Sequence, residues 1–214
     1  QQAFLLTTLS WLSIAIFGSI PFIFSNLNLS IVDSFFESMS GITTTGSTII
    51  VNLESTPKSI LIWRAILQWL GGIGVIVMAI TILPLLNVGG MQLFSNEWTE
   101  KPDNLKPRAK ELAKFLGLTY ISLTLACAIL LWLFGLPKFD AIYHAMTTIA
   151  TGGFSNHDKS IGHYNKVSIE IIIILGMLLS SLPFTLYFTK FTNKNSIIND
   201  GQVKLFLTLA FSFV

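Results

Sequence analysis

Charged residues are scarce in this 214-residue sequence: Asp, Glu, Lys and Arg together make up 11% of it, against about 25% in soluble globular proteins. Hydrophobic residues make up 52%, and the mean hydropathy is +0.68. So few charges cannot cover the surface of a water-soluble domain of this length. The composition therefore excludes a soluble globular protein and predicts an integral membrane protein that packs in a lipid bilayer.

Cysteine is nearly absent, because Cys127 is the single one and it lies inside an apolar run. One cysteine cannot form an intrachain disulfide, and it excludes a multi-cysteine metal site. Its surroundings predict a small apolar side chain facing lipid or a neighbouring helix. The 13 basic and 11 acidic residues give a net charge of +2, which indicates no nucleic-acid partner.

Four apolar runs are long enough to cross a hydrocarbon core of about 30 Å at about 1.5 Å per residue. They are Ala3–Phe24, Ser59–Leu86, Leu112–Phe134 and Val167–Phe191. Arg64 and Gln68 interrupt only the first turns of the second run. Gly71, Gly72 and Gly74 lie in its middle, where small residues favour close helix packing; a hinge is the alternative.

Two shorter apolar segments each lead into a polar loop. The segments are Ile31–Met39 and Phe139–Thr148, and the loops are Ser40–Thr48 and Thr147–Ser155. Ser30 is placed to cap the first segment, which has Asp33 in its first turn. Irregular backbone at membrane depth is tolerated only where it is packed in protein or lines water. We therefore predict two re-entrant hairpins that shape a hydrophilic path.

The two halves of the sequence match without gaps at a shift of 107 residues, the distance from Asp33 to Asp140. The same shift pairs Phe36 with Tyr143, Met39 with Met146, Ile42 with Ile149, Thr44 with Thr151 and Gly46 with Gly153. The repeating unit is span, short helix, loop and span, and the two units are parallel because an even number of crossings returns the chain to one side.

The repeat predicts an all-α polytopic membrane protein with tandem units of helix, short helix and helix, each with a re-entrant loop. The predicted divisions are a first unit at residues 1–86, a cytoplasmic linker at 87–111, a second unit at 112–191, and a cytoplasmic linker with the start of a truncated third unit at 192–214.

Orientation follows from the basic residues of the central linker. They are Lys101, Lys106, Arg108, Lys110 and Lys114. Cytoplasmic segments carry an excess of such residues, so this linker is expected in the cytoplasm and the two loops are expected to open outward. In this orientation four lysines lie outside, namely Lys58, Lys138, Lys159 and Lys166. The prediction therefore depends on the larger number of cations in the cytoplasmic segments.

The loops suit a monovalent cation. The predicted ligands are Thr43, Thr44, Thr45, Gly46, Ala150, Thr151, Gly152 and Gly153. Glycine permits positive φ angles that turn carbonyls toward one side, and threonine adds hydroxyl oxygens, so neutral oxygens can replace a hydration shell. The free carbonyls at the end of each short helix carry about half a negative charge. A divalent ion would require carboxylates. Ordinary polar turns with capping threonines are the alternative.

Arg64 lies near the outer end of its span, where a long side chain can extend to the membrane surface. The other interpretation is a salt bridge to Glu37 that braces the first short helix. Asp33 and Asp140, which match across the repeat, are expected to support the two short helices in the same way.

Four motifs resemble those of the Trk/Ktr/HKT superfamily of potassium transporters, and within it the bacterial Trk membrane subunits. They are DSFFESMSGITTTG at 33–46, WRAILQWLGGIG at 63–74, LNVGGMQLF at 86–94 and ATGGFSNHD at 150–158. The resemblance implies four units around one pore, each with a filter loop and a key glycine, here Gly46 and Gly153. It also implies a homodimer in the cell inner membrane, a cytoplasmic nucleotide-binding ring as regulator, potassium as substrate and no cofactor.

Only two units are predicted in this sequence, which makes it a half-pore. A non-conducting truncated or accessory subunit is therefore an alternative. An intramembrane hydrolase is a more remote one, because Ser155, His157 and Asp158 are the residue types of a catalytic triad. Such side chains normally converge from separate elements, so the sequence favours a transporter over an enzyme.

Overall fold

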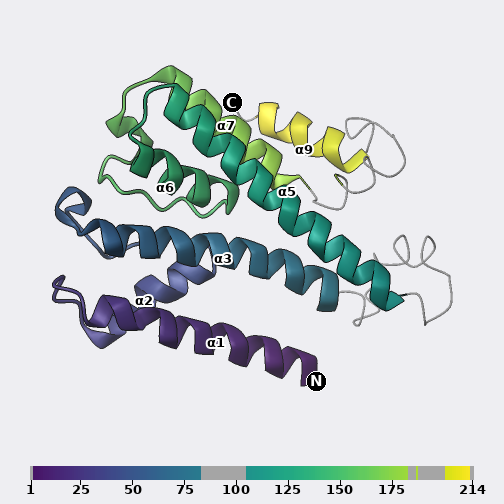
Figure 1. The fold of residues 1–214 in the computed structure, drawn as a ribbon, viewed down its shortest axis with the longest axis horizontal. Helices are drawn as coiled ribbons and strands as arrows, with labels where there is room; N and C mark the ends of the chain where they lie inside the picture. The colour runs from purple at the N-terminus through teal and green to yellow at the C-terminus, as the bar shows by residue number, and fades with distance from the viewer. Residues whose placement is uncertain (1, 83–104, 183–186, 188–200, 213–214) are drawn as a thin grey trace.

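The computed structural model describes residues 2–82, 105–182, 187 and 201–212, and within these ranges it contains helices and loops without a strand (Figure 1). The helices are α1 (Gln2–Ile23), α2 (Ile31–Ile42), α3 (Lys58–Ile82), α5 (Leu105–Leu133), α6 (Lys138–Ile149), α7 (Val167–Ser181) and α9 (Gly201–Ser212), with the 3-10 helices η1 (Leu53–Ser55) and η4 (Ser160–His163). The all-α prediction is confirmed.

Three helices are long and apolar enough to cross a membrane: Leu5–Ile23 in α1, Lys58–Ile76 in α3 and Ala113–Leu133 in α5. Helix α7 is apolar but shorter, with 15 residues. Large apolar side chains are exposed along α1, α5 and α7. Apolar surface of this extent is typical of contact with lipid, because soluble monomers rarely expose such areas.

The two short helices, α2 and α6, have 12 residues each, and their bounds differ by 107 residues at both ends. At about 1.5 Å per residue each is about 18 Å long, which is too short to cross a bilayer. Ser30 and Asp33 form a capping box at the start of α2, as predicted. The predicted end at Ser40–Gly41 is one residue early: α2 ends at Ile42, with Thr43 as its C-cap.

The parallel repeat is visible in the path of the chain. In Figure 1, α1 and α5 run toward the end of the molecule where the chain turns into α2 and α6, and α3 and α7 run back from it. Each short helix follows a residue with positive φ, Asn28 (φ 54°) before α2 and Gly135 (φ 100°) before α6. These two residues are again 107 positions apart, so the repeat extends into the turn that precedes the helix.

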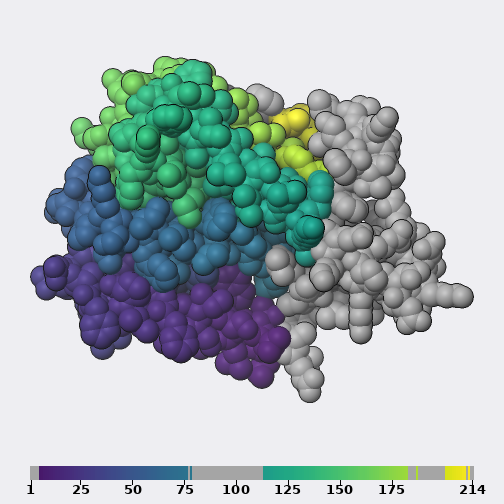
Figure 2. Space-filling model, viewed as in Figure 1, coloured from purple at the N-terminus to yellow at the C-terminus, as the bar shows by residue number. Residues whose placement is uncertain are grey.

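Helix α3 joins the two units, because it packs against α1, α2, α5 and α6. Figure 2 shows its blue atoms between the purple α1 and the green second unit. A Cβ atom at Gly71 would overlap the Ile42 carbonyl, and one at Gly72 would overlap the Tyr120 hydroxyl. These glycines therefore allow close helix packing, which was the first of the two interpretations. Buried Tyr143 and Phe154 of the second unit share a cluster with residues of the first.

Two of the predicted division points lie partly outside the described residues. Helix α5 already begins at Leu105, inside the predicted linker at 87–111, and Pro107 is tolerated in its first turn. Residues 87–104 are outside the described ranges, as is most of the fourth run beyond Leu182. In the predicted segment 192–214, residues 201–212 form α9.

Candidate functional site

The first polar loop folds back onto the end of α2. The amide of Thr43 donates to the Met39 carbonyl at 3.0 Å, and the amide of Thr44 donates to the Gly41 carbonyl at 3.0 Å. The amides of Thr45 and Gly46 both donate to the Ser40 carbonyl, at 3.0 and 3.5 Å. Four consecutive amides therefore point toward the helix end.

The second loop repeats this arrangement 107 residues later. Ala150 donates to the Met146 carbonyl at 3.1 Å, Thr151 to the Thr148 carbonyl at 2.9 Å, and Gly152 to the Thr147 carbonyl at 2.9 Å. Each donor and each acceptor stands at the position that matches its counterpart in the first loop. The two loops thus share one backbone structure, although only some of their side chains are the same.

The φ angles of both loops alternate in sign. Thr44 and Thr151 have φ of 54° and 52°, Gly46 and Gly153 both have 79°, and the residues between them do not have positive φ. Such alternation places the amides on one side of the chain and the carbonyl oxygens on the other. Threonine is sterically disfavoured at positive φ, and backbone strain of this kind is often found at functional sites. The two loops therefore share the same alternating backbone at matching positions.

The expectation that the last helix carbonyls are free is wrong for α2 and α6. The loop amides occupy those of Met39, Ser40 and Gly41 in the first unit, and the matching three in the second. Because the peptides of the loop continue this chain of hydrogen bonds, the negative end of the helix dipole extends to the loop carbonyls.

The two loops touch each other. A Cβ atom at Gly46 would overlap the Gly152 carbonyl, whereas one at Gly153 would meet no atom within 4 Å. The predicted ligand residues differ in exposure. Thr43, Thr45, Thr151 and Gly153 are exposed, Thr44 and Gly46 are half-buried, and Ala150 and Gly152 are buried.

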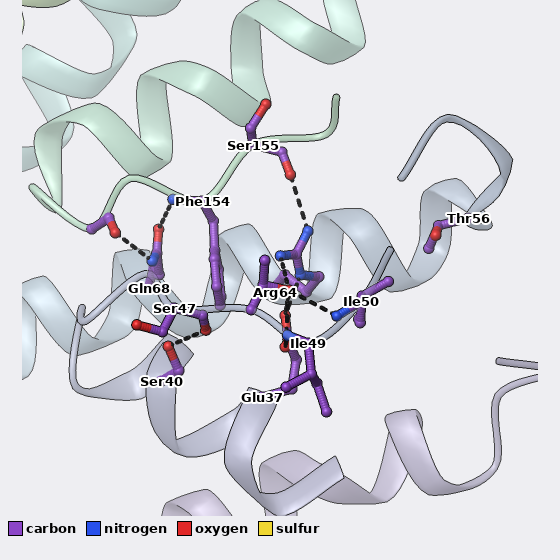
Figure 3. Close-up of polar contacts among 12 residues, drawn as sticks. Glu37, Ser40, Ser47, Ile49, Ile50, Thr56, Arg64, Gln68, Phe154 and Ser155 are labelled. Carbon is purple, nitrogen blue, oxygen red and sulfur yellow. Dashed lines mark hydrogen bonds and ion pairs between the residues drawn. The ribbon is translucent and has the colours of Figure 1, made fainter. Parts of the chain in front are cut away.

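Glu37 and Arg64 form a fully buried ion pair, with 2.7 Å between Arg64 Nε and Glu37 Oε1 (Figure 3). Both side chains have 0% exposure, so the salt bridge to Glu37 is confirmed and Arg64 does not extend to the membrane surface. Glu37 also accepts from the Thr48 hydroxyl at 2.9 and 3.0 Å and from the Ile49 amide at 3.1 Å. The carboxylate thereby fixes the chain that leaves the first loop.

Arg64 also holds the chain that leaves the second loop. Its Nη1 donates to the Ser155 carbonyl at 3.0 Å, and its guanidinium lies over the Phe154 ring at 4.2 Å. The Tyr143 hydroxyl donates to the same carbonyl at 3.1 Å. A buried charge needs an ion-pair partner and full hydrogen bonding. Arg64 has both, and its partners belong to both loops.

Asp33 and Asp140 match across the repeat but have different contacts. Asp33 remains at the cap of α2, where it accepts from the Ser30 hydroxyl at 2.7 Å. Asp140 instead accepts from Asn156 Nδ2 at 2.7 Å and from the Tyr164 hydroxyl at 2.9 Å. Burial, and then this hydrogen bond to Asp140, raise the pKa of Tyr164, so the phenol remains a donor at neutral pH. Asp140 thus ties α6 to the segment after the second loop.

Gln68 is a site residue that the sequence interpretation missed. Its Nε2 donates to the Gly152 carbonyl at 2.9 Å, its Oε1 accepts from the Phe154 amide at 3.1 Å, and its side chain is fully buried (Figure 3). The side-chain amide of Gln68 therefore fixes the second loop through both its nitrogen and its oxygen, although Gln68 belongs to a helix of the first unit. A glutamine in an apolar span was the available signal, because a buried polar group needs a partner.

We expect Gln68→Met to loosen the second loop. The change leaves the Gly152 carbonyl and the Phe154 amide buried without partners. Each unsatisfied group destabilises the folded loop by about 1–3 kcal/mol. Gln68→Glu keeps the acceptor for Phe154 but places a carboxylate against the Gly152 carbonyl in a buried site, so it should loosen the loop at least as much. Hydrogen exchange of the amides at 152–154 measures the change. Unaltered protection in Gln68→Met would show that this glutamine does not position the loop.

The residues of the proposed hydrolase triad do not form one in this structure. Ser155 Oγ accepts from the amide of His157 at 3.0 Å, and the His157 ring faces Asp140 and Glu54. Asp158 Oδ1 accepts from the Leu53 amide at 3.0 Å. The serine, the base and the orienting acid are thus engaged with separate partners, which is not the geometry of nucleophilic catalysis.

A family model, TrkH, described as "Cation transport protein", matches residues 1–214. The chain belongs to the TrkH family. Among TrkH-family proteins, it is 44% identical over 219 residues to the Trk system potassium uptake protein TrkH of Salmonella typhimurium, a match that covers 100% of this chain and 45% of that protein. It is 37% identical over 219 residues to the Trk system potassium uptake protein TrkG of Escherichia coli K12, with the same coverages.

The fold also matches that of a TrkH-family crystal structure, the potassium transporter TrkH from Vibrio parahaemolyticus. The TM-score is 0.77 at 45% identity, over 88% of this chain and 38% of that chain. The chain therefore spans less than half the length of these TrkH-family relatives. The resemblance to Trk proteins is confirmed.

Proposed function

We propose that the two loops are two parts of a potassium selectivity filter in a TrkH-family transporter. The observation that supports this most directly is the shared backbone of the loops. In both, the amides are bound to the end of a short helix and φ is positive at the same two positions, Thr44 and Gly46 in the first loop and Thr151 and Gly153 in the second.

The chemistry follows from the oxygens that this backbone leaves available. Carbonyls of 43–46, 151 and 153, with the threonine hydroxyls, replace part of the ion's hydration shell, while the helix dipoles add a negative potential. The Ala150 and Gly152 carbonyls already accept from the Thr151 hydroxyl and from Gln68 Nε2. The loops carry no carboxylate of their own, which favours a monovalent ion. The membrane potential drives entry with about 2.3 kcal/mol per charge per 100 mV, and no cofactor is required.

The assembly we propose is that of the family. The four Trk-like motifs and the names of the relatives, potassium uptake proteins, support a pore of four units of which this chain supplies two. We further propose that the loops open to the outside of the cell inner membrane, that the full-length protein is a homodimer, and that a cytoplasmic nucleotide-binding ring regulates it.

Rubidium uptake by a potassium-starved host that lacks its own potassium uptake systems tests the proposal. The host carries either this chain alone or the same chain extended to the length of its relatives. We expect uptake with the extended protein and none with the chain alone. Failure of the extended protein would contradict a potassium-conducting function and favour a non-conducting accessory subunit. Uptake by the chain alone would contradict the half-pore.

A further inference from the structure

A cluster of two histidines and one glutamate lies beside the two loops, apart from the filter residues. Glu54 belongs to η1 of the first unit, His163 ends η4 of the second, and His157 lies in the loop between α6 and η4. One potential ligand atom from each of the three lies within 4.8 Å of the other two. The three residues come from both units, so whatever they bind connects the units.

The hydrogen bonding of His157 leaves one ring nitrogen available. Its Nε2 lies 3.5 Å from Asp140 Oδ2, which suits an N–H at that position. Its Nδ1 is then an acceptor, it is enclosed, and it has no hydrogen-bond partner among the described residues. The nearest acid oxygen is Glu54 Oε1, 3.6 Å from Nδ1. A ring held through one nitrogen by a carboxylate, with the other nitrogen open, is the common arrangement of a metal-ligating histidine.

Glu54 is held in place by the loop that carries His157. Its Oε1 accepts from the amide of Asp158 at 3.2 Å, and Asp158 in turn accepts from the amide of Leu53. These two contacts dock η1 onto the loop that carries His157. The carboxylate therefore faces the histidines because of backbone contacts that do not depend on an ion.

We propose that Glu54, His157 and His163 form a binding site for Zn²⁺ or a similar first-row divalent ion. Two imidazoles and one carboxylate are a known three-ligand set for zinc, with water in the fourth position. Mg²⁺ and Ca²⁺ prefer sites made of oxygen alone, so two nitrogen ligands select against them. The ion would bridge the segments that follow the two loops.

Binding requires one side chain to turn. The rings of His157 and His163 are stacked, with 3.7 Å between centroids and 5° between planes. Two nitrogens of a tetrahedral site with bonds of about 2.0–2.1 Å lie at a similar separation, but their lone pairs must converge on the ion. His163 is exposed, so it can tilt toward the ion while His157 stays bound to Asp140.

Titration of the purified full chain with Co²⁺ and then Zn²⁺ tests the site. We expect the visible absorption bands of tetrahedral Co²⁺ at one equivalent, their loss when Zn²⁺ is added, and a higher melting temperature with Zn²⁺. His163→Ala and Glu54→Gln should each weaken binding by at least about tenfold, the lower end of what even an outer-shell partner contributes. Glu54→Gln keeps the oxygen that accepts from Asp158, and His163→Ala removes only the ring contacts of an exposed side chain with His157 and Tyr164.

Glu170→Gln is the matched control, because Glu170 is an exposed carboxylate in the first turn of α7 and should not change the affinity. The absence of tetrahedral bands, or equal binding by the His163→Ala and Glu54→Gln variants and the parent chain, would overturn the proposal. Neither result would affect the proposed filter, because the rubidium assay measures that without added metal.

Discussion

Gly46→Ala should abolish potassium-selective uptake in the full-length protein that carries this chain. The added methyl group would overlap the Gly152 carbonyl, and φ at this residue is 79°. An L side chain in that region costs about 1–2 kcal/mol. The overlap with the Gly152 carbonyl adds to this cost, because the backbone of the second loop, rather than a flexible side chain, would have to move. Rubidium uptake with and without competing sodium measures the loss of transport and of selectivity.

Two other glycines separate the causes of this loss. Gly153 has the same φ of 79° but would place a methyl group in open space, so Gly153→Ala should carry only the backbone strain of about 1–2 kcal/mol and reduce uptake less than Gly46→Ala does. Gly162 has neither positive φ nor a neighbour within 4 Å, and Gly162→Ala should transport normally. If Gly46→Ala retained selective uptake, the first loop could not be part of the filter.

Arg64→Met should destabilise the protein more than any other single change at the site. It leaves the Glu37 carboxylate buried without its cation, and it removes the donor that holds the Ser155 carbonyl. Breaking one side of a buried ion pair costs about 3–5 kcal/mol. Thermal unfolding of the detergent-solubilised protein, followed by size-exclusion chromatography, measures the loss.

A second change in the same protein tests whether the unpaired charge is the cause. Arg64→Met combined with Glu37→Gln removes both charges and should recover part of the stability. Lys58→Met is the control, because it removes an exposed cation from the first turn of the same helix. A double variant no more stable than Arg64→Met would mean that lost hydrogen bonds to the loops, and not the charge on Glu37, account for the effect.

Three of the four predicted spans, the short helices and the matching of the loops were predictable because they depend on local signals. Hydrophobic run length identifies the spans, the capping residues Ser30 and Asp33 identify the start of α2, and the ungapped shift of 107 aligns the two loops. The pair of Glu37 and Arg64 could also be proposed, since an acid and a base in apolar surroundings need each other.

The contacts between the units were not predictable from such signals. Gln68 binds Gly152, 84 residues away, and nothing in the pattern of either segment indicates that pairing. Asp140 departs from Asp33 because Asn156 and Tyr164 in the segment that follows the second loop offer it new donors. The end of α2 was placed one residue too early because glycine usually ends helices, whereas α2 ends at Ile42 with Thr43 as its C-cap.

The hydrogen bonds that Arg64 and Gln68 of α3 make to the second loop have no counterpart in the described residues of α7. The shift of 107 places Ile171 and Leu175 where Arg64 and Gln68 stand, and both are exposed apolar residues. The two units therefore share a fold but are not interchangeable, because Arg64 and Gln68 of the first unit hold the loop of the second. A protein rebuilt with their order exchanged would present an aliphatic surface to a backbone that needs polar partners. The sequence thus encodes the order of the two units as well as a repeated fold.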